Sequence, residues 1–192
     1  CNGLTYTPPH NCACHPEAKL YGFNALAPMA KTRPIPGKVP EEGRLEKGPA
    51  FSDVLPPAVD YSGKDDWPTF RHDQKRTGTS RQDIPAEVGI KWDIKLGGKL
   101  TSPVVAGGLV FVAQTDSHTL YALDQQTGAG VWTFVAGARI DSPPTVERGQ
   151  VVFGCTDGWV YTLRAQDGQL AWKYRVAPLD RRAMAFEQLE SL

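Results

Sequence analysis

Short apolar runs alternate with polar turns from Trp67 onward. The runs SPVVA, LVFVAQ, TLYALD and GVWTFVAG are rich in Val, Phe, Tyr and Trp, and clusters of Gly, Asp, Thr and Ser separate them. This length and composition predict β-strands of about five residues joined by tight turns. The stretch VVAGGLVFVA is apolar at almost every position, which is typical of a sheet covered on both faces. No segment shows the 3.6-residue spacing of an amphipathic helix, so an all-β region is predicted.

The strands repeat with a period of forty residues. Trp92, Trp132 and Trp172 are spaced by 40 residues each, and Gly128 and Gly168 have the same offset. A period near 40 with four strands per period is typical of propeller blades. The fold class expected is therefore all-β: a partial β-propeller of about two four-stranded antiparallel blades plus an outer strand, with an irregular N-terminal region. A β-sandwich is the alternative.

Proline usage divides the chain. Eleven of the sixteen prolines lie within the first 68 residues, and this stretch also mixes glycine with alternating charge. Such a composition favours exposed, irregular chain over a helix or central strand. The expected organisation is a cysteine-bearing segment at 1–28, a Pro/Gly-rich linker at 29–64 and blades over 65–192, with blades at about 100–137 and 140–177 and the start of a further blade at 178–192.

The charge balance excludes some classes of partner. The chain has 21 basic and 21 acidic residues, which gives no electrostatic reason to expect nucleic acid or an anionic membrane surface. No run approaches the roughly 18 to 20 apolar residues that span a bilayer, so no transmembrane segment is predicted. Since the sequence begins with Cys1 and not Met, we expect that something preceding it was removed or belongs to a longer chain.

The motif that identifies a family lies in the first repeat. The stretch ALDQQTGAGVW places Ala122, Asp124, Gly128 and Trp132 in the spacing A-x-D-x-x-x-G-x-x-x-W. This resembles the tryptophan-docking motif of PQQ-like propellers, a family that includes quinoprotein alcohol dehydrogenases and the lipoprotein propeller of outer-membrane assembly. The resemblance implies a structural role: Ala admits an indole, Asp and Gly form the turn between the third and fourth strands, and Trp packs on the adjoining blade.

The second copy of the motif is degenerate. It keeps Gly168 and Trp172 but has Thr162 where Ala is expected and Arg164 where Asp is expected, so the sequence does not predict that the two blade junctions pack identically. The segment KWDIKL, with Trp92, is expected to be the outermost strand of the last blade. Both ends of the chain look cut from something longer, so the remaining blades are the expected partners. Two blades would leave two apolar faces unpaired, which predicts marginal stability or self-association.

Three cysteines crowd the N-terminus, and several roles are open for them. The preferred interpretation is a disulfide from Cys1 to Cys12 or Cys14 in an oxidising compartment. A zinc site from these cysteines with His10 or His15 is an alternative. The run Cys12-Ala13-Cys14-His15 is one residue short of a haem attachment site, and Cys1 is a candidate for lipid anchoring. Cys155, in the strand VVFGC, is expected to be a buried free thiol.

The resemblance leaves two classes of function open. Quinoprotein dehydrogenases bind PQQ on the ring axis with calcium, a catalytic aspartate and a disulfide between adjacent cysteines. This sequence has no Cys-Cys pair, and no carboxylate stands out by position, so no catalytic or metal-binding residue is predicted. The leading hypothesis is a non-catalytic scaffold, without cofactor, that binds protein or glycan in a secreted or periplasmic bacterial protein. The alternative is oxidation of alcohols or sugars with PQQ and calcium.

Overall fold

The computed structural model describes residues 5–7, 24–26, 41–52, 66–80, 83–178, 180–185 and 187–191. The chain divides into two compact units, Cys1–Lys38 and Val39–Leu192. In the first unit, β1 (Thr5–Thr7) and β2 (Asn24–Leu26) form an antiparallel pair. The roles predicted for the N-terminal cysteines and histidines remain predictions, because these residues lie outside the described residues: Cys1, His10, Cys12, Cys14 and His15.

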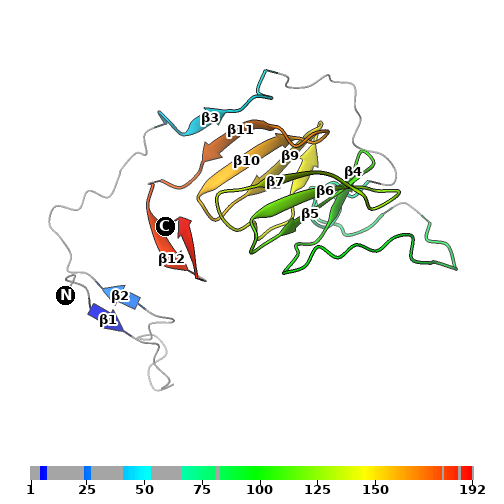
Figure 1. Cartoon of the computed structure of the whole chain (residues 1–192), viewed down its shortest axis with the longest axis horizontal. Helices are drawn as coiled ribbons and strands as arrows, with labels where there is room; N and C mark the ends of the chain where they lie inside the picture. The colour runs from blue at the N-terminus through cyan, green and yellow to red at the C-terminus, as the bar shows by residue number, and fades with distance from the viewer. Residues whose placement is uncertain are drawn as a thin grey trace. The chain divides into compact units, whose positions relative to one another are not determined.

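The second unit contains two antiparallel blades (Figure 1). Blade 1 has four strands in sequence order, and blade 2 repeats this order. The second strand of blade 1, LVFVAQ, is apolar along most of its length, as the sequence pattern predicts for a strand covered on both faces. The strands of blade 1 are β4 (Val104–Ala106), β5 (Leu109–Gln114), β6 (Thr119–Asp124) and β7 (Gly130–Val135). Those of blade 2 are β8 (Thr145–Glu147), β9 (Gln150–Gly154), β10 (Trp159–Arg164) and β11 (Leu170–Arg175).

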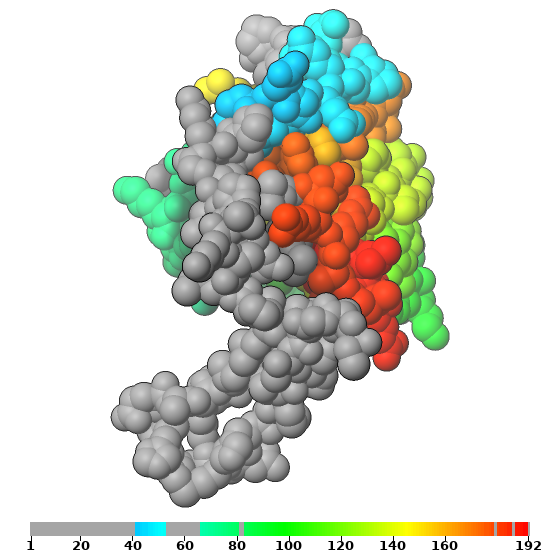
Figure 2. All heavy atoms as spheres, turned by 90° about the vertical axis from the view of Figure 1, so that its left-hand side faces the viewer, coloured from blue at the N-terminus to red at the C-terminus, as the bar shows by residue number. Residues whose placement is uncertain are grey.

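A fifth strand extends blade 2. It is β3 (Leu45–Lys47), which comes from the stretch expected to be linker and pairs antiparallel with β11. Backbone hydrogen bonds continue beyond β3, from Gly48 N to Ala171 O at 2.8 Å and from Ala50 N to Leu170 O at 3.0 Å. We call residues 41–52 the strap. In Figure 2 the strap, in cyan, lies against the orange residues of the last strand of blade 2.

Facing side chains of the two blades form one core. Phe111, Leu120 and Ala122 of blade 1 and Leu163 of blade 2 have no exposed surface. Aromatic rings meet across the boundary, where the Phe134 ring lies 5.8 Å from the Tyr161 ring and 6.2 Å from the Phe153 ring. Burial of this apolar area is the main stabilising contribution to the packing of the blades.

Residues 67–68, which precede the blades, pair with the first strand of each blade. β4 and β8, the first strands of the two blades, contact each other. Trp67 N donates to Val105 O at 2.6 Å, and Val105 N donates back to Trp67 O at 2.9 Å. One residue later, Pro68 O accepts a hydrogen bond from Val146 N at 2.7 Å. Residues 67–68 therefore pair with the inner strands of both blades.

A C-terminal hairpin crosses the turns at one end of both blades. It consists of β12 (Arg182–Ala185) and β13 (Gln188–Ser191). Ser191 N donates to Thr156 O at 2.7 Å in blade 2, and the Gln188 side chain lies 2.7 Å from His118 Nε2 in blade 1. Figure 2 shows this hairpin, in red, beside orange and green residues. That 178–192 begins a further blade remains a prediction.

One expected strand is missing. The segment around Trp92, predicted as an outermost strand, has no strand partner in the described part of the chain. Its apolar side chains are correspondingly open to solvent, with Val88 77% and Ile90 90% exposed. The prediction of a strand there is therefore wrong for this chain, because a strand requires neighbours for its backbone hydrogen bonds. Within the same described ranges, no helix has the length and apolarity needed to cross a membrane.

Candidate functional site

The tryptophan of each repeat lies on the glycine turn of the following repeat. Trp132, on β7, donates its indole N–H to the Ala165 carbonyl at 2.9 Å. A Cβ built on Gly168 would lie 2.6 Å from Cδ2 of this indole, and Gly168 has a φ of +71°. Both the left-handed backbone and the close ring therefore require glycine at this position.

Trp92 makes the same junction one repeat earlier. Its indole N–H donates to the Gln125 carbonyl at 3.0 Å. A Cβ on Gly128 would lie 2.7 Å from the ring, and Gly128 has a φ of +73°. The segment around Trp92 forms no strand. Its indole nevertheless packs on the Gly128 turn in the same way as the Trp132 indole packs on the Gly168 turn.

Asp124 holds the first turn in shape. Its Oδ1 accepts hydrogen bonds from Gln126 N at 3.0 Å and from Thr127 N and Oγ1, both at 2.8 Å. The bonds from Thr127 are the largest cause that lowers the pKa of Asp124 below its ordinary value. Gly128 N donates to Asp124 O at 2.8 Å, which closes the turn. The carboxylate is thus used in local structure.

The degenerate second turn has the same backbone geometry. Gly168 N donates to Arg164 O at 2.9 Å, as Gly128 N does to Asp124 O. Here Asp167 supplies the carboxylate, which accepts from Arg164 Nε at 2.9 Å and from Gln169 N at 3.2 Å. The bond from Arg164 is the largest cause that lowers the pKa of Asp167. The junctions of Trp92 and Trp132 are therefore alike in backbone geometry, although the second copy of the motif is degenerate.

The position opposite each tryptophan is buried in both repeats. Ala122 faces Trp132 across β6 and β7, and Thr162 faces Trp172 across β10 and β11. Ala122 and Thr162 have no exposed surface. The Thr162 hydroxyl makes no hydrogen bond within the described residues, so the substitution of Ala by Thr buries a polar group without a partner.

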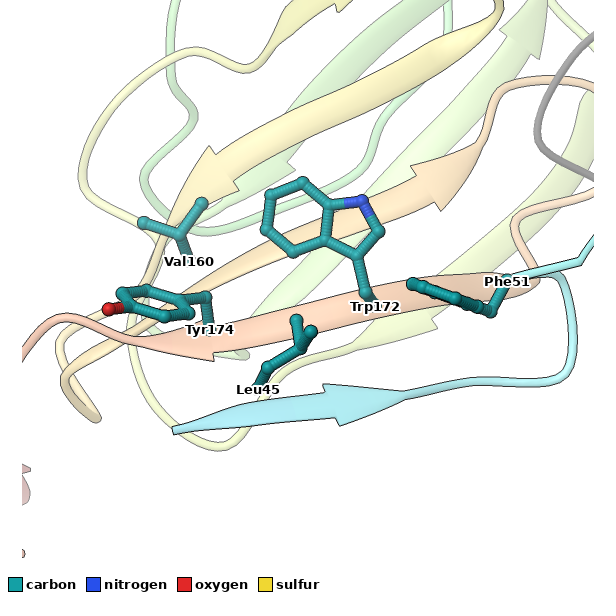
Figure 3. Close-up of a pocket in the computed structure, with 5 residues that line it drawn as sticks. All are labelled: Leu45, Phe51, Val160, Trp172 and Tyr174. Atoms are coloured by element: carbon teal, nitrogen blue, oxygen red, sulfur yellow. The ribbon is translucent and has the colours of Figure 1, made fainter. Parts of the chain in front are cut away.

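Trp172 has a different environment from the other two tryptophans. It lines an open apolar pocket with Leu45, Phe51, Val160 and Tyr174 (Figure 3). Two of these residues, Leu45 and Phe51, belong to the strap. Sequence reasoning identified Trp172 but missed both strap residues, because nothing local indicates that residues 45–51 pair with a strand more than 120 positions later.

Cys155 lies beside polar groups that together do not lower the pKa of its thiol. Its Sγ donates to Ala138 O at 3.2 Å, and burial is the main cause that raises its pKa to about 12. Tyr161 donates its hydroxyl to Asp157 Oδ2 at 2.6 Å, and burial followed by this carboxylate raises the pKa of Tyr161. A thiolate is the nucleophilic form of cysteine, so this thiol, protonated at neutral pH, is not arranged for catalysis. The structure agrees with the expected free thiol, although Cys155 is partly and not fully buried.

A tight basic turn follows residues 67–68 in the chain. Three residues other than glycine have left-handed backbone there: Arg71, His72 and Arg76, with φ of 60°, 76° and 55°. The Arg71 and Arg76 guanidinium groups lie 5.5 and 5.7 Å from the centroid of the Phe70 ring. Phe70 is 40% exposed, so this turn presents to solvent an aromatic ring with two cations beside it.

The described residues do not supply the site that PQQ and calcium would need. Within them, no group of three or more His, Cys, Asp or Glu side chains is placed to hold a metal ion. The first strands of the two blades, β4 and β8, are hydrogen bonded to Trp67 and Pro68. The carboxylates of the junction turns, Asp124 and Asp167, are used in those turns. The residues present therefore do not fit the group.

Antiparallel blades joined through an indole on a glycine turn define the class of this protein, a β-propeller of the PQQ-like type. The family model described as outer membrane protein assembly factor BamB, a PQQ-repeat model, matches residues 85–192, more than half of the chain. The chain belongs to this family. The predicted family and the all-β partial propeller are thus confirmed.

Individual relatives have different functions, and they include outer-membrane assembly factors, quinoprotein dehydrogenases and a serine/threonine-protein kinase of Deinococcus radiodurans. The chain is 31% identical over 94 residues to the outer membrane protein assembly factor BamB of Yersinia pestis, covering 46% of this chain and 24% of that protein. It is 32% identical over 94 residues to the quinoprotein ethanol dehydrogenase of Pseudomonas aeruginosa, covering 44% and 15%. The quinohemoprotein alcohol dehydrogenase structure from Comamonas testosteroni superposes with a TM-score of 0.53 at 24% identity, covering 66% and 22%. The chain therefore spans at most about a quarter of the length of these proteins.

Proposed function

We propose that this chain is a non-catalytic β-propeller scaffold segment that contacts protein or glycan. The observation that carries the proposal is the pairing of Trp67 and Pro68 with Val105 and Val146. This pairing covers the first strands of both blades with the chain's own backbone, and the family resemblance implies that an axial cofactor would lie on that side. The family match to a BamB-type protein supports the same reading.

The exposed aromatic and cationic turn is the contact region that we propose. Phe70 lies beside Arg71 and Arg76, and aromatic and arginine side chains dominate the energetics of many protein interfaces. An aromatic face also stacks on sugar rings, so the same surface suits a glycan. We place the protein in the periplasm or outside the cell, as the names of its outer-membrane relatives suggest. Anchoring through Cys1 is a further part of this proposal.

A second candidate is part of a PQQ-dependent dehydrogenase for alcohols or sugars. The observation that favours it is the 32% identity to a quinoprotein ethanol dehydrogenase. The two candidates differ in cofactor binding. The test is titration of the chain with PQQ in the presence of calcium, followed by dye reduction with ethanol or glucose, with an apo quinoprotein dehydrogenase as the positive control. We expect no stoichiometric complex and no dye reduction. Tight one-to-one binding with substrate-dependent dye reduction would refute the scaffold.

A further inference from the structure

The basic turn, residues 70–78, has a strained backbone. Three of its residues other than glycine have left-handed backbone, namely Arg71, His72 and Arg76, and only three more such residues occur in the rest of the described ranges. A side chain at such a position costs free energy that glycine would not cost. Strain of this kind persists where the surrounding structure enforces it, and it gathers at binding sites. The turn therefore presents arginine side chains at positions where glycine would be less strained.

Hydrogen bonds within the turn fix its shape. Asp73 Oδ1 accepts from Thr77 N at 3.0 Å, and Asp73 Oδ2 accepts from Thr77 Oγ1 at 2.6 Å. Gly78 N donates to Arg71 O at 3.0 Å, and Arg76 N donates to Asp73 O at 2.9 Å. The bonds from Thr77 are the largest cause that lowers the pKa of Asp73. The one carboxylate in residues 70–78 is therefore ionised at neutral pH and used inside the turn.

The base of the turn is attached to both blades. It follows Trp67 and Pro68, which are hydrogen bonded to the first strands of the two blades. Thr69 Oγ1 lies 2.8 Å from Thr145 Oγ1 at the start of β8. The His72 ring packs edge-on against the Trp67 ring, with 5.0 Å between the centroids. A turn held in this way loses little conformational entropy when a partner binds to it.

The positive charge of the turn is left available. Arg71, Lys75 and Arg76 are exposed, and within the described residues none of them makes an ion pair or a side-chain hydrogen bond. The formal net charge of the whole chain is zero, so this local charge is not part of a general excess of basic residues. A surface with a local excess of one sign attracts groups of the opposite sign. The turn is therefore suited to a negatively charged partner.

Phe70 favours carboxylates over a sugar ring at this position. The Arg71 and Arg76 guanidinium groups lie 5.5 and 5.7 Å from the centroid of its ring, so a stacking sugar would have to compete with them. A guanidinium beside a ring keeps N–H groups free to form the two parallel hydrogen bonds that a carboxylate accepts. Residues 74–80 are all exposed, so the turn presents its cations outward.

We propose that the basic turn binds an extended, acidic segment of a partner protein. Alternate residues of an extended segment point to the same side, so two of its carboxylates reach Arg71 and Arg76 together. Lys75 adds attraction without a fixed contact. This inference rests on the contact region proposed above, and it specifies the partner of that region.

The test uses two labelled peptides of eight residues, one alternating Glu with Ser and the other alternating Gln with Ser. Fluorescence anisotropy measures binding, and NMR records the backbone amide signals of the unmodified chain. We expect the Glu peptide to bind and to shift the signals of residues 70–78, and the Gln peptide to do neither. Affinity for the Glu peptide should fall at least ~5-fold between about 50 and 300 mM NaCl, because salt screens exposed charges.

Matched variants locate the site. Arg71→Gln combined with Arg76→Gln should weaken binding of the Glu peptide at least ~10-fold, because both charge-assisted pairs are lost. The control combines Arg148→Gln with Arg181→Gln, which removes the same charge at two other exposed positions and should change binding less than ~2-fold. Arg71→Lys combined with Arg76→Lys keeps the charge but loses the planar fork, so it should weaken binding about 3-fold. Far-UV circular dichroism checks the fold of each variant, and the NMR map of the unmodified chain needs no variant.

Several results would overturn the proposal. These are equal binding of the Gln peptide, equal loss of binding in the control variant, and no shift of residues 70–78 with the Glu peptide at low salt. Tighter binding of polygalacturonate than of the Glu peptide at the same residues would make the partner an acidic glycan. A neutral dextran that shifts these signals would support the contact region and refute the acidic partner. The PQQ titration is independent of these results, so the scaffold and its acidic partner fail separately.

Discussion

Replacing Gly168 by Ala tests whether the indole on the glycine turn holds the blades together. A side chain at a φ of +71° costs about 1 kcal/mol through the backbone alone. The added Cβ would also lie 2.6 Å from the Trp132 ring, which has to move away. Loss of the indole bond to Ala165 O and imperfect repacking add roughly 2 kcal/mol. We expect Gly168→Ala to lower the free energy of unfolding by about 3 kcal/mol.

Gly108→Ala is the matched control. Gly108 has a φ of +79°, but nothing lies within 4 Å of a Cβ built on it, so this variant should lose only about 1 kcal/mol. Urea unfolding followed by far-UV circular dichroism measures both variants without relying on tryptophan fluorescence. In a Trp132→Leu background, the cost of Gly168→Ala should fall to that of the control. Equal losses for the two glycine variants, or a full penalty without the indole, would refute the reasoning.

Four further predictions follow from buried or partly buried groups. Thr162→Val should stabilise the chain by about 1 kcal/mol in urea unfolding, because it keeps the shape and removes a hydroxyl that has no partner within the described residues; destabilisation would contradict this. Because burial raises its pKa to about 12, Cys155 should react with a maleimide at pH 8 at least ~10-fold more slowly in the folded chain than in urea. The raised pKa values of Cys155 and Tyr161 also mean that the unfolded chain loses these protons first, so stability should be full below about pH 9 and fall as the pH rises toward 12, and a flat profile would contradict this. Arg139→Met should remove the 2.9 Å ion pair with Glu190 and speed proteolysis within the C-terminal hairpin by about tenfold, whereas unchanged cleavage would show that this pair does not hold the hairpin.

Much of the fold could be predicted because its signals are local. The alternation of apolar runs and turns, and the forty-residue spacing of Trp92, Trp132 and Trp172, indicated strands and blades directly. The turn residues were recognisable for the same reason, since Gly128 and Gly168 are required by the backbone and by the ring above them. These features depend on residues near one another in the sequence or on their exact repetition.

The remaining features depend on distant pairings. Strand β3 has three residues in a proline-rich stretch, and its pairing with β11 has no signature in either segment. The salt bridge between Arg139 and Glu190 is equally invisible in the sequence. The likeness of the two turns could not be predicted for a different reason. The turn conformation depends on Gly168 and on backbone hydrogen bonds, and Asp167 provides the carboxylate that Asp124 provides in the first turn.

The direction of the tryptophan junctions sets an order of assembly during synthesis. Trp92 and Trp132 each reach a carbonyl 33 residues later in the chain, never earlier. At a ribosomal rate of roughly 5 to 20 residues per second, each indole waits about 2 to 7 s before its acceptor has been made. The blade synthesised most recently therefore has an uncovered aromatic surface until the next turn has been made. The junctions form in order from the N-terminal blade toward the C-terminal one.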